Sequence, residues 1–338
     1  MHTHVTETHT IERTHQVVIV DGLKLPQHIP GAMRLSLESL QQLYPEAKYH
    51  LWSGEELRAF IGDTFRPAVL RAFDTLRPYA YKCDLARYCL LFIQGGMYVD
   101  LAVQPLNRWR IPVSCGVAAF SEIYPGMKSW TCTQNSVMWS EPGRAEWETA
   151  IEWIVENYEK RYYGPHDHYP TGGAVLGRAF AAAMAARGQS HSADDQWVGE
   201  VRYVTPEQYM QNVCYVAPDR TVVGIRTKVS AGELAEIGLS GTNNYCDIWA
   251  ARQVYGETEH VWTADSTRLV TEHYVSRSPK SFFIPAGTVG RALWGPFVRV
   301  EAGSYRLRFS FGPNTIFRRL LVNVCAEYAT TNTDLISC

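Results

Sequence analysis

The sequence predicts an α/β fold followed by a small all-β region. Helix and strand spacings of apolar residues alternate along the first three quarters of the chain. The stretch from Tyr79 to Leu106 joins one helix pattern to one strand pattern through a Gly-Gly pair. From about His260 the chain changes to short alternating segments rich in glycine and proline. We therefore expect a mobile tail over 1–15, an α/β domain over 16–258 and a β-sandwich-like region over 259–338.

The first elements alternate between strand and helix. A β-branched run from Val17 to Val20 ends at Asp21-Gly22, which predicts a buried strand and a turn. The spacing then predicts a helix over 35–44, which Pro45 stops, and a second strand over 49–52. Ser53 is a residue type that caps helices, so the next helix is expected over 55–61.

The central stretch begins as a helix. Its apolar residues recur at positions i, i+3, i+4 and i+7, namely Leu85, Tyr88, Cys89 and Phe92. Asp84 and Arg87 are three residues apart and therefore lie close together on this helix. Gly95-Gly96 is expected to end the helix, because glycine adopts the left-handed C-terminal conformation without steric cost.

After the glycines the spacing changes to two, which predicts one strand ending at Pro105. Along it Met97, Val99, Leu101 and Val103 would face one side, and Tyr98, Asp100 and Ala102 the other. Asp100 would then lie near the C-terminal end of a buried strand. In α/β sheets, ligands bind beyond the carboxyl ends of the strands.

This stretch resembles the core motif of the DXD-containing glycosyltransferases of the Och1-like and glucosylating-toxin-like group, glycosyltransferase family 32. The matching residues stand in the family's order and spacing: Ala80, Asp84, Arg87, Tyr88, Gly95, Gly96, Tyr98 and Asp100. The resemblance implies a GT-A-like (Rossmann-type) nucleotide-sugar-binding domain. The chain departs from the motif at one position, because Ala102 stands where the family has the second Asp.

That departure bears directly on metal binding. Two carboxylates two apart on an extended strand face the same way and can share one hard divalent cation. In the family the second Asp is the direct ligand of that cation, Mn²⁺ or Mg²⁺, so Ala102 removes the principal protein carboxylate. Three explanations stay open: a natural variant that binds metal more weakly or through other ligands, a degenerate enzyme, and an engineered inactive mutant.

The resemblance also implies roles for individual residues. Asp84 and Arg87 would hold hydroxyls of the donor sugar, and Asp100 would contact ribose, sugar and cation. Asn135, ahead of Pro142-Gly143, would bond the donor sugar, although a plain turn or strand-edge asparagine carries equal weight. Tyr98 and position Ala102 are further expected donor contacts, and Trp249 is expected over the diphosphate. Thr171-Gly172 begins a helix whose N-terminus could face an anion. Trp52 is either a donor contact or a core residue. Asn243 and Asn244 are candidate metal ligands beside Asp100.

The second half of the first domain continues the pattern. We expect strand segments over 113–122, 201–204, 213–216 and 221–225, and helices over 144–158 and 174–187. Between those helices lies a Pro/Gly loop with His166-Asp167-His168. These are metal-ligand types, but adjacent loop residues seldom converge on one ion, so we expect no metal there. The last 80 residues are short for a ~100-residue sandwich, so that domain is either minimal or truncated.

Composition narrows the class of protein. The net charge of −2 argues against a nucleic-acid binder. Eight scattered cysteines without a CxxC pair indicate reduced thiols in a cytoplasmic protein rather than zinc ligands or a disulfide framework. The N-terminus lacks the apolar core of a signal peptide and no apolar run approaches a transmembrane span, from which we expect a soluble bacterial enzyme.

Three functions are considered for a chain with these features. The first is a retaining glycosyltransferase that moves a sugar from a nucleotide-sugar donor, with UDP-sugars favoured, to a glycan, lipid-linked or protein acceptor in polysaccharide biosynthesis. The second is a catalytically impaired relative that only binds nucleotide sugar or glycan, which Ala102 favours. The third, a structural α/β protein, is disfavoured by the ordered set of Asp84, Arg87 and Gly95-Gly96.

Overall fold

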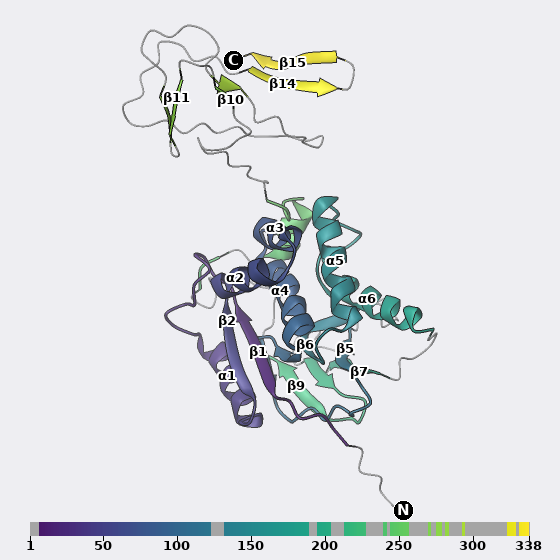
Figure 1. The fold of residues 1–338 in the computed structure, drawn as a ribbon. Helices are drawn as coiled ribbons and strands as arrows, with labels where there is room; N and C mark the ends of the chain where they lie inside the picture. The colour runs from purple at the N-terminus through teal and green to yellow at the C-terminus, as the bar shows by residue number, and fades with distance from the viewer. Residues whose placement is uncertain are drawn as a thin grey trace, which may run out of the picture. The chain divides into compact units, whose positions relative to one another are not determined.

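The computed structural model describes residues 7–122, 132–188, 195–203, 213–227, 239–241 and 244–256, and further along only Val275 and a few short strands. The chain divides into two compact units, 1–258 and 259–338 (Figure 1). The first unit carries the nine-stranded sheet and the helices described below. No helix in the described ranges combines the length and apolar composition needed to cross a bilayer.

The elements of the first unit follow the α/β alternation. They are β1 (Arg13–Val18), α1 (Gly31–Leu43), β2 (Lys48–Ser53), α2 (Gly54–Thr64), α3 (Pro67–Thr75), α4 (Tyr79–Gln94), β3 (Gly96–Val99), β4 (Val103–Pro105), β5 (Val117–Ser121), β6 (Thr133–Ser140), α5 (Ala145–Glu159), α6 (Gly173–Ala186), β7 (Gln196–Tyr203), β8 (Val213–Val216), β9 (Val222–Arg226) and α7 (Tyr245–Ala250). The described strands form one sheet in the order β2-β1-β3-β6-β5-β7-β8-β9-β4. The α/β class is confirmed, with the mixed sheet expected of a GT-A-like domain.

Helices cover both faces of this sheet. On one face a core forms between the strands and α2 to α6, and it includes the fully buried Tyr88, Trp147 and Phe180. On the other face Leu40 and Tyr44, at the end of α1, pack against β3, β5 and β6. Burial on both faces requires the central strands to be apolar throughout, and the burial of Met97, Tyr98 and Val99 meets that requirement.

Most predicted elements appear within a few residues of their expected bounds. Ser53 caps α2 as expected, and it does so in a capping box with Glu56. The Gly-Gly stop is also confirmed: Gly95 and Gly96 have φ angles of 61° and 87°. A Cβ on Gly96 would lie 2.7 Å from the Arg13 carbonyl oxygen, so the position tolerates only glycine. Helix α3 was not predicted.

The prediction of one continuous strand through Asp100 is wrong. β3 ends at Val99, and a turn follows in which the Val103 amide donates to the Asp100 carbonyl at 2.9 Å. β3 pairs with β1 and β6 in the middle of the sheet, whereas β4 pairs with β9 at the far end of the strand order. The turn exists because the chain changes neighbours there. Asp100 and Ala102 therefore do not share one face of an extended strand.

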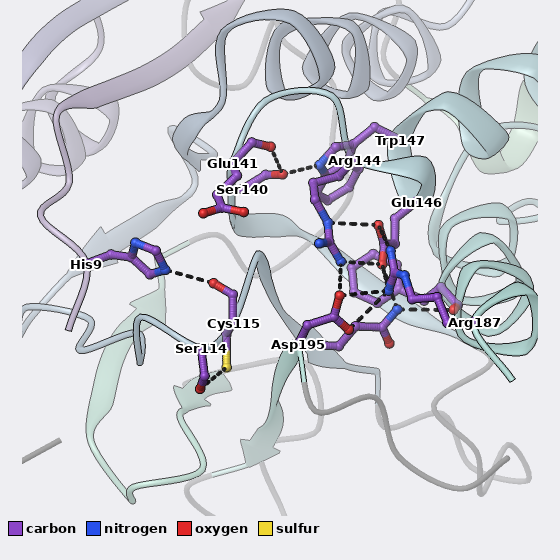
Figure 2. Close-up of polar contacts among 12 residues, drawn as sticks. His9, Ser114, Cys115, Ser140, Glu141, Arg144, Glu146, Trp147, Arg187 and Asp195 are labelled. Carbon is purple, nitrogen blue, oxygen red and sulfur yellow. Dashed lines mark hydrogen bonds and ion pairs between the residues drawn. The ribbon is translucent and has the colours of Figure 1, made fainter. Parts of the chain in front are cut away.

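A buried charge network fixes the start of α5 to α6 and to the segment before β7 (Figure 2). The Glu146 side chain is fully buried and pairs with Arg144 at 3.1 Å and Arg187 at 3.0 Å. Asp195 bonds the same two arginines, at 2.6 and 3.0 Å. Burial alone would raise the pKa of Glu146, but Arg187, Gln196 and Arg144 outweigh it and hold that pKa below its ordinary value. This network is structural.

The second unit contributes three antiparallel strand pairs. They are β10 (Val270–Thr271) with β13 (Leu293–Trp294), β11 (Ser276–Ser278) with β12 (Ser281–Phe283), and β14 (Asn323–Tyr328) with β15 (Thr331–Ser337). The hairpin predicted within 295–311 lies outside the described residues. The β-sandwich-like character of this region stays a prediction. In the first unit, the six cysteines with described side chains form no disulfide.

Candidate active site

Helix α4 brings two charged residues into the protein interior. Asp84 and Arg87 lie one turn apart, with only 7% and 4% of their surfaces exposed. The helix is buried at almost every position from Tyr81 to Leu91, because it lies between the sheet and the outer helices. Charges at such depth need partners close at hand. The partners come from three other segments of the chain.

The Asp84 carboxylate is bonded on both oxygens. The Thr171 hydroxyl donates to Oδ2 at 2.7 Å, and the Asn135 amide donates to Oδ1 at 2.8 Å. Arg87 lies 3.4 Å from the same Oδ1. Burial raises the pKa of Asp84 to about 6, and Arg87 together with the Thr171 and Asn135 hydrogen bonds limits that rise. Asp84 therefore changes charge close to neutral pH.

The Arg87 guanidinium connects the two acidic residues. It lies 3.1 Å from Asp100 Oδ1 and donates to the Asn135 carbonyl at 2.6 Å. Its plane stands 4.7 Å from the centre of the Tyr98 ring. The Tyr98 hydroxyl in turn donates to Asp100 Oδ1 at 2.6 Å. Four residues predicted for the site, Asp84, Arg87, Asp100 and Asn135, thus form one connected network.

Exposure differs sharply within this network. The Asp100 side chain is 29% exposed, against 10% for Asp84 and 5% for Arg87. Asp100 also sits at the turn after β3, where its amide donates to the Ser136 carbonyl at 2.7 Å. A ligand approaching the network therefore meets Asp100 first. The Asn135 amide, whose plain strand role was an open alternative, bonds Asp84 and the Tyr88 hydroxyl.

The residues at the DXD position do not fit a divalent cation. Asp100 Oδ1 already serves Arg87 and Tyr98, and the second position carries the methyl group of Ala102. The Ala102 carbonyl accepts from the amide and hydroxyl of Thr227, at 2.9 and 3.1 Å. Asn244 caps α7 by accepting from the Asp247 amide, and Asn243 lies outside the described residues. A hard cation prefers several anionic oxygens, which this set lacks.

The two tryptophans predicted for the donor site have other contacts. Trp52 belongs to the core: it is 9% exposed, stacks 4.1 Å from His50 and donates to His15 Nδ1 at 3.2 Å. The core alternative is therefore the one the structure supports. The Trp249 indole donates to the Tyr163 carbonyl at 2.8 Å, and Arg252 lies 5.2 Å from its ring centre.

Comparison with known proteins places this network in a family. The model described as "Glycosyltransferase sugar-binding region containing DXD motif" matches residues 30–115. That range contains Asp84, Arg87, Asp100 and Ala102. Residues 30–115 are therefore similar to the sugar-binding region of DXD-motif glycosyltransferases. The sugar-binding region thus runs from the start of α1 to the segment before β5.

Curated relatives match part of the chain. A glycosyltransferase of Acanthamoeba polyphaga mimivirus is 29% identical over 116 residues, which are 34% of this chain and 45% of that protein. Inositol phosphoceramide mannosyltransferase 3 of Schizosaccharomyces pombe is 31% identical over 80 residues, 24% of this chain and 21% of its own length. The chain thus spans less than half the length of these relatives. A solved structure, "PaToxG Glycosyltransferase", aligns with a TM-score of 0.38 at 14% identity, covering 54% of this chain and 76% of that one.

Just outside the sugar-binding region, Thr171 and Gly172 lead into α6. Thr171 is fully buried, and its hydroxyl points to Asp84 rather than outward to an anion. Gly172 is the N-cap of the helix. A Cβ on Gly173 would lie 2.7 Å from the Thr133 carbonyl oxygen, so the glycine lets α6 approach β6 closely. This close packing of α6 on β6 places Thr171 within hydrogen-bonding distance of the Asp84 carboxylate.

In the loop before Thr171, three ligand-type side chains lie closer together than we expect of adjacent loop residues. A turn closes where the Tyr169 amide donates to the His166 carbonyl at 3.0 Å. Within it the ligand-type atoms of His166, Asp167 and His168 all lie within 4.8 Å of one another. Adjacent residues converge here because the chain turns instead of extending. The Tyr81 hydroxyl, on the first turn of α4, donates to the Asp167 carbonyl.

Sequence reasoning missed two contributors to the sugar-binding region. The fully buried Ser36 hydroxyl, on α1, donates to the carbonyls of Asp100 and Val103 and so fixes the turn. No sequence signal pointed to it. Tyr88 was assigned only to an apolar face, yet its hydroxyl accepts from Asn135. Its place beside Arg87 in the family motif was the available signal.

Proposed function

We propose that the chain is a retaining glycosyltransferase that transfers a sugar from a nucleotide-sugar donor, with a UDP-sugar favoured, to a glycan, lipid-linked or protein acceptor. The observation that carries the proposal is the family match over 30–115, together with the buried network of Asp84, Arg87, Asp100 and Asn135 inside and beside it. Asp84 is nearly buried beside the Arg87 guanidinium while Asp100 stays partly exposed, an arrangement that a ligand-binding role accounts for.

We assign donor contacts to Asp84, Arg87 and Asp100 according to how far each side chain is exposed. Asp100, the most exposed member, is assigned to the ribose and the donor sugar. Asp84 and Arg87 are assigned to sugar hydroxyls, which they reach from beneath Asp100. Their hydrogen bonds to Asn135 and Thr171 hold both side chains in one rotamer before the donor arrives. Tyr98 fixes Asp100 from the strand side.

Negative charge develops on the leaving diphosphate, so a cationic group near the turn is required. Arg226, the register partner of Val103, is the cation we assign to that task. Burial alone would lower its pKa, but Tyr215 and Glu122 outweigh it and raise it well above its ordinary value. Retention follows from the family resemblance: the acceptor attacks on the face from which the diphosphate departs. The resemblance also implies a divalent cation, which the residues at the DXD position do not fit.

Binding of the donor tests the proposal. Thermal shift and calorimetry against UDP- and GDP-sugars, each with Mn²⁺ and with chelator, are expected to show binding of a UDP-sugar. Replacing Asp100 by Asn should weaken that binding at least about tenfold, since a hydrogen bond to a charged group contributes about 1.5–3 kcal/mol. Asp74→Asn, which alters an exposed carboxylate paired with Arg58, is the matched control. Absence of binding to every donor would refute the enzyme proposal for this chain.

A second function is favoured by one observation, the alanine at position 102. A relative that binds nucleotide sugar or glycan without turnover would keep Asp84, Arg87 and Asp100 and lose only the metal carboxylate. Replacing Ala102 by Asp discriminates the two. If the alanine alone silences the site, A102D gains Mn²⁺-dependent transfer, whereas an intact enzyme already transfers before the change. We also propose a cytoplasmic location, on the pattern of scattered cysteines without a CxxC pair.

A further inference from the structure

The loop between α5 and α6 places two imidazoles around a carboxylate. The rings of His166 and His168 are parallel, with an interplanar angle of 1° and centroids 5.2 Å apart. Asp167 Oδ1 lies in contact with His166 Nδ1 and 3.7 Å from His168 Nε2. Two imidazole nitrogens and one carboxylate oxygen are therefore directed at a common volume. No role in the donor network has been assigned to any of these three side chains.

The carboxylate at the centre is buried. Asp167 is 7% exposed, and its carboxylate also interacts with the Cys246 side chain. Its near neighbours are the ring nitrogens of His166 and His168. A buried carboxylate oxygen requires either hydrogen bonds or a cation.

The spacing suits a small transition metal. Bonds of 2.0–2.1 Å to a tetrahedral Zn²⁺ separate neighbouring ligand atoms by about 3.3 Å. The 3.7 Å between Asp167 Oδ1 and His168 Nε2 is close to that value, and the three ligand atoms lie within 4.8 Å of one another. His166 Nδ1 is in direct contact with Asp167 Oδ1, so these two atoms must move apart before both can bind one ion. Imidazole with carboxylate favours Zn²⁺ and its neighbours in the first transition row over Ca²⁺ or Mg²⁺.

We propose that His166, Asp167 and His168 bind one divalent transition-metal ion, with Zn²⁺ the best match. Three protein ligands leave at least one coordination position for an exogenous ligand. The turn is held from beneath by the Tyr81 hydroxyl, which donates to the Asp167 carbonyl, so the ligands are anchored to α4. The His168 main chain also lies against Gly172, where an added Cβ would be 3.3 Å from the His168 carbonyl oxygen. The ion is thus placed at the entry of α6.

Zinc binding is measured on the full chain without any nucleotide, so the outcome does not depend on donor binding. After chelator treatment, calorimetric titration with ZnCl₂ is expected to show one site, and zinc should raise the melting temperature. Asp167→Asn and His168→Ala are each expected to weaken that site at least about 100-fold, since even outer-shell changes cost 10- to 100-fold. His28→Ala, which removes an exposed imidazole on another loop, should leave the affinity unchanged.

A second measurement needs no variant. Cu²⁺ bound to the wild-type chain should give an electron paramagnetic resonance spectrum with hyperfine coupling from two imidazole nitrogens. Far-UV circular dichroism of the metal-depleted variants checks that they fold. The proposal is overturned if the wild type takes up no more Zn²⁺ than the His166→Ala/His168→Ala double variant, or if the Cu²⁺ spectrum lacks nitrogen coupling.

Discussion

Replacing Arg87 by Met isolates the central charge of the candidate site. Methionine keeps the length and apolar stem of arginine while removing the guanidinium. The change deletes the contacts to Asp84 at 3.4 Å, to Asp100 at 3.1 Å and to the Asn135 carbonyl at 2.6 Å. Two carboxylates are then left close together without their cation. Removing one partner of a buried ion pair costs about 3–5 kcal/mol.

The cost of Arg87→Met must depend on pH. The pKa of Asp84 is already raised by burial from 3.8 to about 6, with Arg87 the strongest influence that lowers it. A carboxyl with a raised pKa in the folded state gives stability that is complete below its unfolded pKa and lost as pH rises through the folded one. In the wild type that loss is about 3 kcal/mol, at 1.36 kcal/mol for each of roughly two pKa units. Without Arg87 the pKa rises further, so the loss grows and extends to higher pH.

Urea unfolding followed by tryptophan fluorescence at pH 5 and pH 8 measures the free-energy cost of Arg87→Met and its dependence on pH. We expect the difference between wild type and Arg87→Met to be larger at pH 8 than at pH 5 by at least about 1 kcal/mol, one pKa unit. Arg58→Met is the control, because its ion pair with Asp74 is exposed and contributes about 0–1 kcal/mol at either pH. A cost that is equal at both pH values would refute the assignment of a raised Asp84 pKa.

Three further substitutions test the same reasoning. Asp84→Asn removes the ionisable group, so its unfolding free energy should lack the decline between pH 4 and pH 6 that we expect for the wild type in pH-dependent urea titrations; a decline that persists would assign it to another group. Thr171→Val, nearly isosteric, should cost about 1.5–3 kcal/mol by thermal unfolding at pH 8, where Asp84 is charged, and less at pH 5. Glu146→Gln should cost about 3–5 kcal/mol at pH 7, because Arg144 and Arg187 lose their shared buried partner, and little change in the urea midpoint would contradict that network.

Local chemistry was enough to predict much of the sugar-binding region. The helix of Asp84 and Arg87 follows from apolar spacing, and its end at Gly95-Gly96 follows from the conformational freedom of glycine. The cap at Ser53 was also predictable, because its side chain bonds the backbone only three residues away. In each case the deciding contact lies within one or two turns of the chain.

The turn at Asp100 could not be predicted in this way. A period of two over seven residues is as compatible with two short strands as with one. The partner that separates them, β9, lies more than a hundred residues further along the chain, and its pairing with β4 is a tertiary contact. Ser36, which bonds the carbonyls on both sides of the turn, comes from α1. No local pattern encodes that arrangement.

The turn changes the meaning of Ala102. On an extended strand, Asp100 and a second aspartate would face one ion together, and alanine would simply delete a ligand. In this fold Asp100 is already balanced by Arg87 and Tyr98, while the Ala102 carbonyl is engaged by Thr227. The network of one guanidinium and two carboxylates, Asp84 and Asp100, carries a net charge between zero and −1, depending on the protonation of Asp84. A third carboxylate at position 102 would demand a cation, whereas the present set is close to balance without one.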